Sequence, residues 1–308
     1  MERAATIGRL DGKQSGGGHE RRLFYDKCGR YLFIAAAFLM TIIIFSIIFF
    51  VGKQGLMTFA EVSPLEFFFS ASWDPSLGKF GALSFIVGSL VTTILSVLIG
   101  APLGLLGAIF AIFLAKVAPS WLKNIMRPAT DLYVAIPSVV YGYIGLTLLV
   151  PYLRDALGAT TGFGVLAASL VLAIMIMPTI LSISTDALNA VPKPLEEASL
   201  ALGATWWQTM VHVIVPAAAP GILTAVVLAM ARAIGETMAV QMLIGNTPQI
   251  VTSLLSPTAT LTSNIVVEMG NTPFGSVWGN ALFLMAFVLL LISFAMILVI
   301  RRFGTRRV

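Results

Sequence analysis

The longest apolar run in the chain, residues 80–115, contains no charged side chain, and five other apolar runs accompany it. A helix needs about 20 apolar residues to cross the hydrocarbon core of a bilayer. The runs that meet this length are residues 31–51, 80–115, 126–150, 164–185, 220–243 and 277–300. The sequence therefore predicts an all-α, polytopic bundle of six transmembrane helices.

The composition agrees with lipid as the main solvent. Hydrophobic residues make up 58% of the 308 and charged residues only 11%, with a mean hydropathy of +0.94. Soluble domains carry about a quarter charged residues, so this chain could not cover a water-facing surface of its own size. The single cysteine, Cys28, excludes a disulfide within the chain. The net charge is +5, and the arginines and lysines cluster beside the apolar runs. This placement favours a role in membrane topology over nucleic-acid binding.

Residues 80–115 are long enough to be either one tilted helix or a tight pair of helices. One crossing places the next basic residues on the same side as the N-terminus, whereas two crossings place them outside. Positive residues prefer the cytoplasmic side, so we expect a single crossing. Pro102 is expected to kink this helix, and Gly100 and Gly104 to let a neighbouring helix approach closely.

The six-span topology separates the basic residues cleanly. Fifteen of the nineteen, counting Arg127 at the edge of the third span, fall on the side of the two termini, and three fall on the other. We therefore expect a multi-pass protein of the bacterial inner membrane with both termini in the cytoplasm. Residues 1–30 are expected to form a flexible cytoplasmic tail, residues 31–300 the permease domain, and residues 301–308 a basic cytoplasmic tail.

The loop at residues 192–216 predicts two short amphipathic helices joined at a glycine. Pro194 suits a first helical turn, and Glu196 and Glu197 follow where a helix dipole favours anions. Gly203 permits a sharp turn, and the second helix is expected over residues 205–215, ending at Pro216.

Such an elbow suits docking into a groove on a partner protein, with Trp206, Trp207 and Met210 as anchors. The alternative is a helix pair lying on the lipid headgroups, with the tryptophans at the membrane boundary.

The stretch EEASLALGATWWQTMVHVIVP resembles the EAA loop of the membrane subunits of bacterial ABC importers. Glu197, Ala198 and Ser199 match the Glu-Ala-Ala start, Gly203 falls at the family spacing, and Pro216 closes the motif. The resemblance implies a MetI-like importer permease fold. It also implies that this loop, with Glu196, Glu197, Ala198, Gly203, Trp206 and Trp207, inserts into a cleft of an ATPase subunit.

The fifth span contains two charges, Arg232 and Glu236, four residues apart and expected on one helical face. Charges at membrane depth usually face a bundle interior or a water-filled path. The planar guanidinium of Arg232 is suited to bind a phosphate. A nearby carboxylate could weaken this binding, so that the anion is released. The alternative is a salt-paired couple that only fixes helix packing. Thr237 could donate a hydrogen bond to the same path or bond a backbone carbonyl.

The motif RAIGETMAV around these charges resembles the permeases of the phosphate-specific (Pst) transport system, and the PstC-type subunit more than the PstA-type. The segment IPSVVYGYIGL, at residues 136–146, supports the same resemblance. It implies import of inorganic phosphate by a complex with a PstA-like second permease, two PstB-like ATPases and a PstS-like phosphate-binding protein. The alternatives are a PstA-type subunit, a permease for sulfate or molybdate, or a secondary transporter or channel that works alone.

The chain is not expected to carry a cofactor, a metal or an enzymatic site of its own. Gly8, Gly12 and Lys13 come near a phosphate-binding loop, but their spacing is one residue short and Gln14 replaces the hydroxyl residue. His212 has no second metal ligand near it in the sequence. ATP and magnesium are expected on the partner ATPases, and nucleic acid is not expected as a partner.

Overall fold

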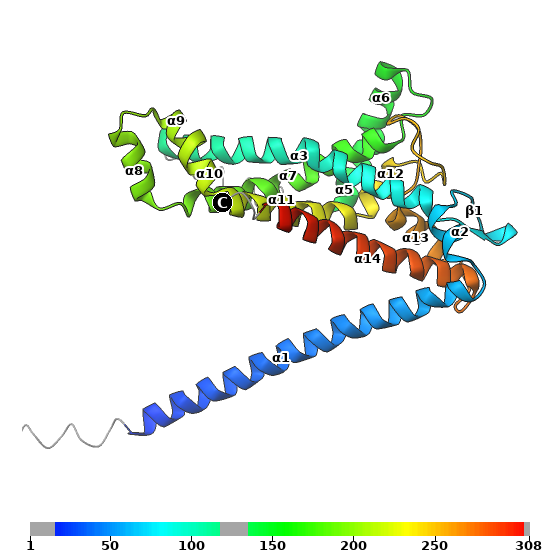
Figure 1. Ribbon diagram of the computed structural model, residues 1–308, viewed down its shortest axis with the longest axis horizontal. Coiled ribbons are helices and arrows are strands. Elements are labelled where there is room, and N and C mark those ends of the chain that lie inside the picture. Colours follow the sequence, from blue (N-terminus) through cyan, green and yellow to red (C-terminus); the bar gives the residue numbers. More distant parts are fainter. Residues whose placement is uncertain (1–15, 118–134, 305–308) are drawn as a thin grey trace, which may run out of the picture. The chain divides into compact units, whose positions relative to one another are not determined.

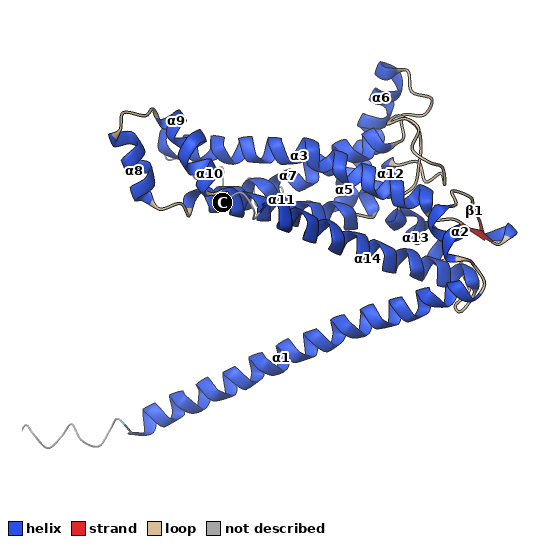
Figure 2. Cartoon of the chain, viewed as in Figure 1, coloured by secondary structure: helices blue, strands red, loops and turns tan. Residues whose placement is uncertain are grey.

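The computed structural model describes the backbone of residues 16–117 and 135–304, and the side chains of residues 25–113 and 135–302. Nearly all regular structure in this part of the chain is helical (Figure 2), so the expected all-α fold is confirmed. The chain forms two compact units, Met1–Lys53 and Gln54–Val308, which we describe separately.

The first unit contains most of α1, which runs from Gly16 to Leu56 as one helix. Its apolar side chains, such as Phe33 and Phe45, are exposed, as expected for a helix that meets lipid. The helix already begins at Gly16, so the prediction of a flexible tail over residues 1–30 is wrong for residues 16–30. Once an apolar segment has nucleated a helix, extending it through good helix formers such as arginine and lysine costs little free energy.

The second unit opens with short elements that cover one end of the bundle. Ser63 caps α2 by accepting a hydrogen bond from the Glu66 amide. A hairpin of two antiparallel strands follows, each two residues long, in which Trp73 pairs with Phe80. The Trp73 ring meets the rings of Phe80 and Phe85 edge to face, with centroids 5.5 and 5.3 Å apart. The elements of this end are η1 (Met57–Ala60), α2 (Pro64–Phe69), β1 (Trp73–Asp74), η2 (Pro75–Leu77) and β2 (Lys79–Phe80).

The centre of the second unit is a pair of long helices, α3 (Leu83–Val117) and α7 (Val165–Asn189), which pack side by side (Figure 1). A Cβ atom added to Gly104 would lie 2.8 Å from the Cβ of Ile180, and one added to Gly100 would lie 2.9 Å from Ile176. These distances confirm the predicted close approach. The helix α3 is continuous through Pro102, which confirms one helix rather than a tight pair.

The expected third span is described only from residue 135, so its first part, which includes Arg127 and Asp131, lies outside the described residues. The rest forms α5 (Ser138–Ile144), the π-helical turn η3 (Gly145–Leu149) and α6 (Val150–Leu157). Gly145 lies against Val171 of α7 and Leu243, so this segment packs on the bundle.

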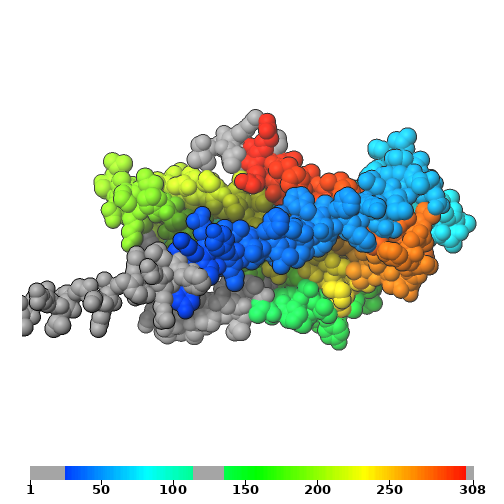
Figure 3. Space-filling view, turned by 90° about the horizontal axis from the view of Figure 1, so that it is seen from below, coloured from blue at the N-terminus to red at the C-terminus, as the bar shows by residue number. Residues whose placement is uncertain are grey.

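The segment between α7 and the next long helix contains α8 (Lys193–Ala201), α9 (Trp206–Thr209), the π-helical turn η4 (Met210–Ile214) and α10 (Val215–Ala217). Figure 3 shows the α8–α9 segment at one end of the second unit and the α2–β2 segment at the opposite end. A bend of 68° at Ala218 separates α9–α10 from the helix that follows.

The last elements are α11 (Ala219–Gly235), α12 (Met238–Leu243), α13 (Leu261–Met269) and α14 (Val277–Gly304). The expected fifth span is thus two helices, because α11 ends at Gly235. The helix α14 reaches Gly304, so the expected basic tail at residues 301–308 begins inside a helix.

In the described part of the chain, four helices are long and apolar enough to cross a bilayer, and five if the bent pair around Ala218 counts as one span. The four are Tyr25–Ala60, Leu83–Phe113, Val165–Asn189 and Val277–Arg302. The multi-pass architecture is therefore confirmed, while the predicted sixth span depends on the segment that is only partly described.

Candidate functional site

The elbow at residues 192–216 has the predicted form of two short helices joined at a glycine. Gly203 adopts φ +85°, a left-handed conformation that L side chains rarely adopt. Thr205 then starts α9 with a capping box, in which its hydroxyl accepts from the Gln208 amide and the Gln208 side chain accepts from the Thr205 amide. The local sequence therefore fixes both the turn and the second helix start.

The second helix of the elbow was expected to end at Pro216, but it continues to Ala217. Pro216 has no N–H, and its ring would clash with a carbonyl four residues earlier in a regular helix. The helix accommodates it by widening into the π turn Met210–Ile214, which ends two positions before the proline. The backbone breaks only at Ala218.

One face of the elbow is buried against the bundle. Met210 is fully buried and Ile214 is 6% exposed, in a cluster with Ala108 and Ile112 of α3 and Leu188 of α7. The prediction that Met210 anchors a partner protein is therefore wrong, because this side chain anchors the elbow to its own bundle instead.

The two tryptophans of the elbow have different surroundings. The Trp206 ring lies on Phe113 of α3, with centroids 5.3 Å apart. Trp207 is 58% exposed, so it is the tryptophan available to a partner. Ser199 of α8 and Thr209 of α9 join the two helices through a hydrogen bond of 2.9 Å between their hydroxyls.

The outer face of the elbow is apolar and open. Leu202, beside the Gly203 turn, is 90% exposed, and Leu195 and Leu200 of α8 are 45% and 42% exposed. Glu197 and Ala198 are exposed, and Glu196 is half-buried. Apart from Trp206, which packs on Phe113, the residues predicted to meet an ATPase thus lie on an accessible surface that carries exposed apolar side chains and an acidic edge.

Arg232 and Glu236 do not share one helical face, which corrects the sequence prediction. The helix α11 ends at Gly235, and Glu236 is extended, with φ −68° and ψ 128°. The Glu236 carboxylate accepts a hydrogen bond of 3.4 Å from the Ala239 amide in the first turn of α12, whose N-cap residue is Thr237. Within the described residues no ion pair joins the two side chains, so the salt-paired alternative is not what the structure shows.

Arg232 instead points to α7, where its guanidinium donates a 3.1 Å hydrogen bond to the hydroxyl of Thr179. The side chain is half-buried. Because the partner is neutral, the positive charge of Arg232 is not cancelled by this contact. Thr237 donates to the Gly235 carbonyl at 3.2 Å, so its hydroxyl bonds the backbone at the helix break.

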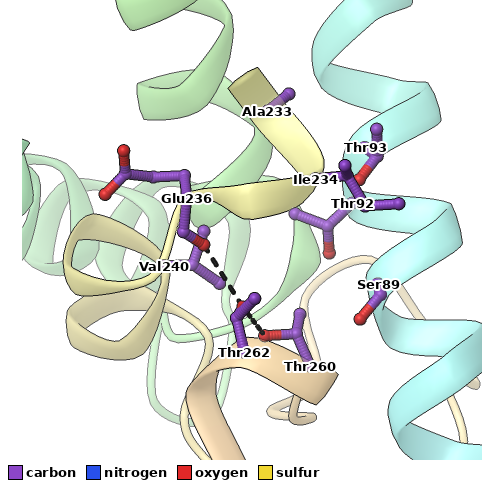
Figure 4. Close-up of a pocket in the computed structure, with 9 residues that line it drawn as sticks. All are labelled: Ser89, Thr92, Thr93, Ala233, Ile234, Glu236, Val240, Thr260 and Thr262. Carbon is purple, nitrogen blue, oxygen red and sulfur yellow. Dashed lines mark hydrogen bonds between the residues drawn. The ribbon is translucent and has the colours of Figure 1, made fainter. Parts of the chain in front are cut away.

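A small polar cavity lies beside this break, and sequence reasoning did not anticipate it (Figure 4). Its volume is about 10 Å³, room for about one water molecule. Hydroxyl side chains from α3 and from the start of α13 line most of it. The lining residues are Ser89, Thr92, Thr93, Ala233, Ile234, Glu236, Val240, Thr260 and Thr262. The sequence feature that could have indicated the cavity is the group of hydroxyl residues at positions 89–96 inside an otherwise apolar span.

Glu268 belongs to α13, and its carboxylate accepts hydrogen bonds from two indoles. Trp73 donates to it at 2.9 Å and Trp278 at 2.6 Å. These bonds connect the β1–β2 hairpin to α13 and α14. The residue therefore braces the end of the bundle that lies away from the elbow.

No group of three or more histidine, cysteine, aspartate or glutamate side chains comes together among the residues whose placement is described. The phosphate-loop-like residues Gly8, Gly12 and Lys13 lie outside those residues.

Comparison with known proteins places the chain in a family. Residues 105–307 match the family model described as the inner membrane component of binding-protein-dependent transport systems. The probable ABC transporter permease protein YqgH of Bacillus subtilis is 50% identical over 283 residues, which is 91% of each chain. The phosphate transport system permease protein PstC of Mesorhizobium japonicum is 36% identical over 296 residues, covering 89% of this chain and 88% of that one.

A solved structure shares the fold. The methionine ABC transporter MetNI, in an inward-facing conformation, aligns with a TM-score of 0.55 at 19% identity, over 77% of this chain and 100% of that one. The importer permease fold expected from the elbow is therefore confirmed. The chain is a multi-pass membrane protein and belongs to the family of inner membrane components of binding-protein-dependent transport systems.

Proposed function

We propose that this chain is the membrane-spanning, PstC-type subunit of an ATP-driven importer that carries inorganic phosphate into the cell. The elbow is the observation that carries the proposal, because it is anchored to α3 and α7 on one face and open to a partner on the other. The relatives named as phosphate transport permeases, at about a third identity over most of the chain, support phosphate as the substrate.

The elbow would transmit the movement of an ATPase to the bundle. A partner that grips Leu202 and Trp207 would move α8, and the Ser199–Thr209 hydrogen bond passes that movement to α9. The buried Met210 and Ile214 then carry it to α3 and α7. Because α10 leads directly into α11, the same movement reaches the helix that bears Arg232.

Arg232, Glu236 and Thr237 are proposed to line the phosphate path. Arg232 would bind a phosphate oxygen through its fork of donors, in exchange for the neutral hydroxyl of Thr179. Glu236, at the helix break, would repel the anion and so favour its release. Thr237 would hold the break in place through its bond to the Gly235 carbonyl.

The complete transporter would contain a PstA-like second permease, two PstB-like ATPases and a PstS-like phosphate-binding protein. The elbow and both termini would face the cytoplasm, and the end that Glu268 braces would face the binding protein. ATP and magnesium would bind to the ATPases, so this chain would need no cofactor and perform no hydrolysis.

The test is uptake of labelled phosphate by the purified complex in proteoliposomes, with ATP inside and the binding protein outside. Arsenate should compete with phosphate, and sulfate and molybdate should compete weakly. Uptake of sulfate or molybdate in place of phosphate would contradict the substrate. Full uptake by this chain alone, without an ATPase, would contradict the proposed class and favour a secondary transporter or channel.

A further inference from the structure

The hydroxyl of Thr92 is buried in the cavity wall with no bond to satisfy it. Thr92 is 2% exposed, and its Oγ1 has no hydrogen-bond partner among the described residues. Figure 4 shows this hydroxyl directed into the cavity that Ser89, Thr260 and Thr262 also line. A buried donor without a partner costs free energy, so a ligand that accepts a hydrogen bond from this hydroxyl inside the cavity would be favoured.

The other walls of the cavity favour an anion. The N-terminus of α13 faces it, because the N-cap residue Thr260 and the first-turn residue Thr262 are both lining residues. A helix N-terminus carries partial positive charge and attracts anions. Ser89 accepts a 2.9 Å bond from the Leu261 amide, which fixes α13 against α3.

Negative charge is kept out of the cavity. The Glu236 carboxylate points away from Thr92 and Ser89, whereas the Glu236 backbone carbonyl accepts a 3.2 Å bond from Thr262 (Figure 4). The outward-turned carboxylate accepts a hydrogen bond from the Ala239 amide of α12. An anion in the cavity would therefore meet hydroxyls and a helix N-terminus, without a carboxylate facing it.

We propose that this cavity is a subsite for a tetrahedral oxyanion on the transport path, with the Thr92 hydroxyl as a direct donor. The inference rests on the proposed function and adds a binding step to it. In the present conformation the cavity has room for about one water molecule. Its walls come from α3, from the break between α11 and α12, and from α13, so a shift at that break enlarges it.

The chemistry of the subsite suits an intermediate step. Neutral hydroxyls bind an anion more weakly than an arginine does, and a transport path needs sites that release their ion. Ala233 and Ile234, which follow Arg232 in α11, form part of the cavity wall. The subsite thus lies within one helical turn of the Arg232 backbone, and in this proposal the anion passes between the two sites.

The test compares Thr92→Val with Thr92→Ser in the complete transporter, using labelled inorganic phosphate in proteoliposomes. Valine has nearly the same shape and removes only a hydroxyl that has no partner among the described residues, so the thermal stability of the complex should be unchanged or higher. Loss of one hydrogen bond to a charged ligand should raise KM, or lower kcat/KM, about tenfold or more. The serine variant should stay close to wild type.

Ser84→Ala is the matched control. Ser84 is also fully buried without a hydrogen-bond partner among the described residues and also belongs to α3, but it does not line the cavity. It should leave uptake unchanged. If the valine complex does not assemble, Thr92→Ala against Thr92→Ser makes the same comparison.

The outcomes separate the two proposals. Wild-type kcat/KM in Thr92→Val would overturn the subsite and leave the proposed function standing, as would an equal loss in Ser84→Ala. A wild-type complex that carries another oxyanion would overturn phosphate as the substrate, and the Thr92 comparison would then be made with that oxyanion.

Discussion

The hydroxyls of Ser199 and Thr209 lie 2.9 Å apart and join the two helices of the elbow across the Gly203 turn. Thr209 is fully buried and directly precedes Met210, which packs against α3 and α7. This one bond therefore links the helix that a partner can reach to the helix that the bundle holds.

Removing this bond should weaken coupling without unfolding the protein. We expect Ser199→Ala and Thr209→Val each to lower phosphate uptake by the complex about two- to tenfold, as a net hydrogen bond is worth about 0.5–1.5 kcal/mol. ATP hydrolysis should fall less, so more ATP is used per phosphate carried. The double variant should lose little beyond either single one, and additive losses would show that the two hydroxyls act separately. Thr224→Val, which removes an exposed bond within α11, is the control.

The turn at Gly203 should tolerate a side chain such as asparagine but not a β-branched one such as valine. A Cβ atom there meets nothing within 4 Å, so the penalty comes only from φ +85°. A valine in this conformation is strained, whereas asparagine adopts it several-fold more often than other residues. Gly203→Val should strongly reduce uptake at normal membrane insertion, and Gly203→Asn should retain most of it. Equal uptake by both variants would show that the turn does not need this geometry.

The contact between α3 and α7 should not accept even a methyl group at Gly104. The added Cβ would lie 2.8 Å from the Cβ of Ile180 and 3.0 Å from the Met177 carbonyl oxygen, so the helices must separate. Overpacking of this kind costs about 1–3 kcal/mol. Gly104→Ala should lower the thermal unfolding midpoint of the purified protein by several degrees. Gly270→Ala, where a Cβ meets nothing within 4 Å, should not, and an unchanged midpoint in both would contradict the close approach.

Arg232 can be tested for transport separately from packing. Arg232→Gln removes the charge, and we expect uptake to fall about tenfold or more, because a bidentate charged contact to phosphate is lost. Thr179→Val removes only the bond that the guanidinium makes in this structure. It should keep uptake within a few-fold of wild type. If both variants lost the same activity, Arg232 would serve to hold α11 against α7.

The elbow was predictable because its determinants are local. Gly203 indicates the left-handed turn, because glycine adopts this conformation without strain. In the same way, Gly104 indicates a position where another helix can approach α3 closely, although the sequence does not say which helix. The break at Glu236 was not predicted because Gly235 lies in an apolar run whose pattern is that of one continuous helix. The extended backbone of Glu236 and its contact with the Ala239 amide appear only in the structure. The sequence does not distinguish the two tryptophans. In the structure, the ring of Trp206 packs on Phe113 of α3, whereas Trp207 is exposed.

The cavity depends on contacts that no local pattern specifies. Ser89 and Leu261 are 172 positions apart, and their hydrogen bond brings α13 to the hydroxyl run of α3. A hydroxyl residue within a transmembrane helix usually bonds its own backbone, so the sequence alone does not single out Thr92. Only the structure shows that the Thr92 hydroxyl is buried without a hydrogen-bond partner among the described residues.

The central claim is that the exposed face of the elbow meets a nucleotide-hydrolysing subunit. A photoreactive side chain at Leu202, which is 90% exposed, tests it most directly in the purified, membrane-reconstituted complex. The account predicts cross-linking to the ATPase subunit, with a yield that changes when ATP binds, and none from the same group at the fully buried Ala225. Cross-links from Leu202 to lipid alone, in a complex that contains the ATPase, would contradict it.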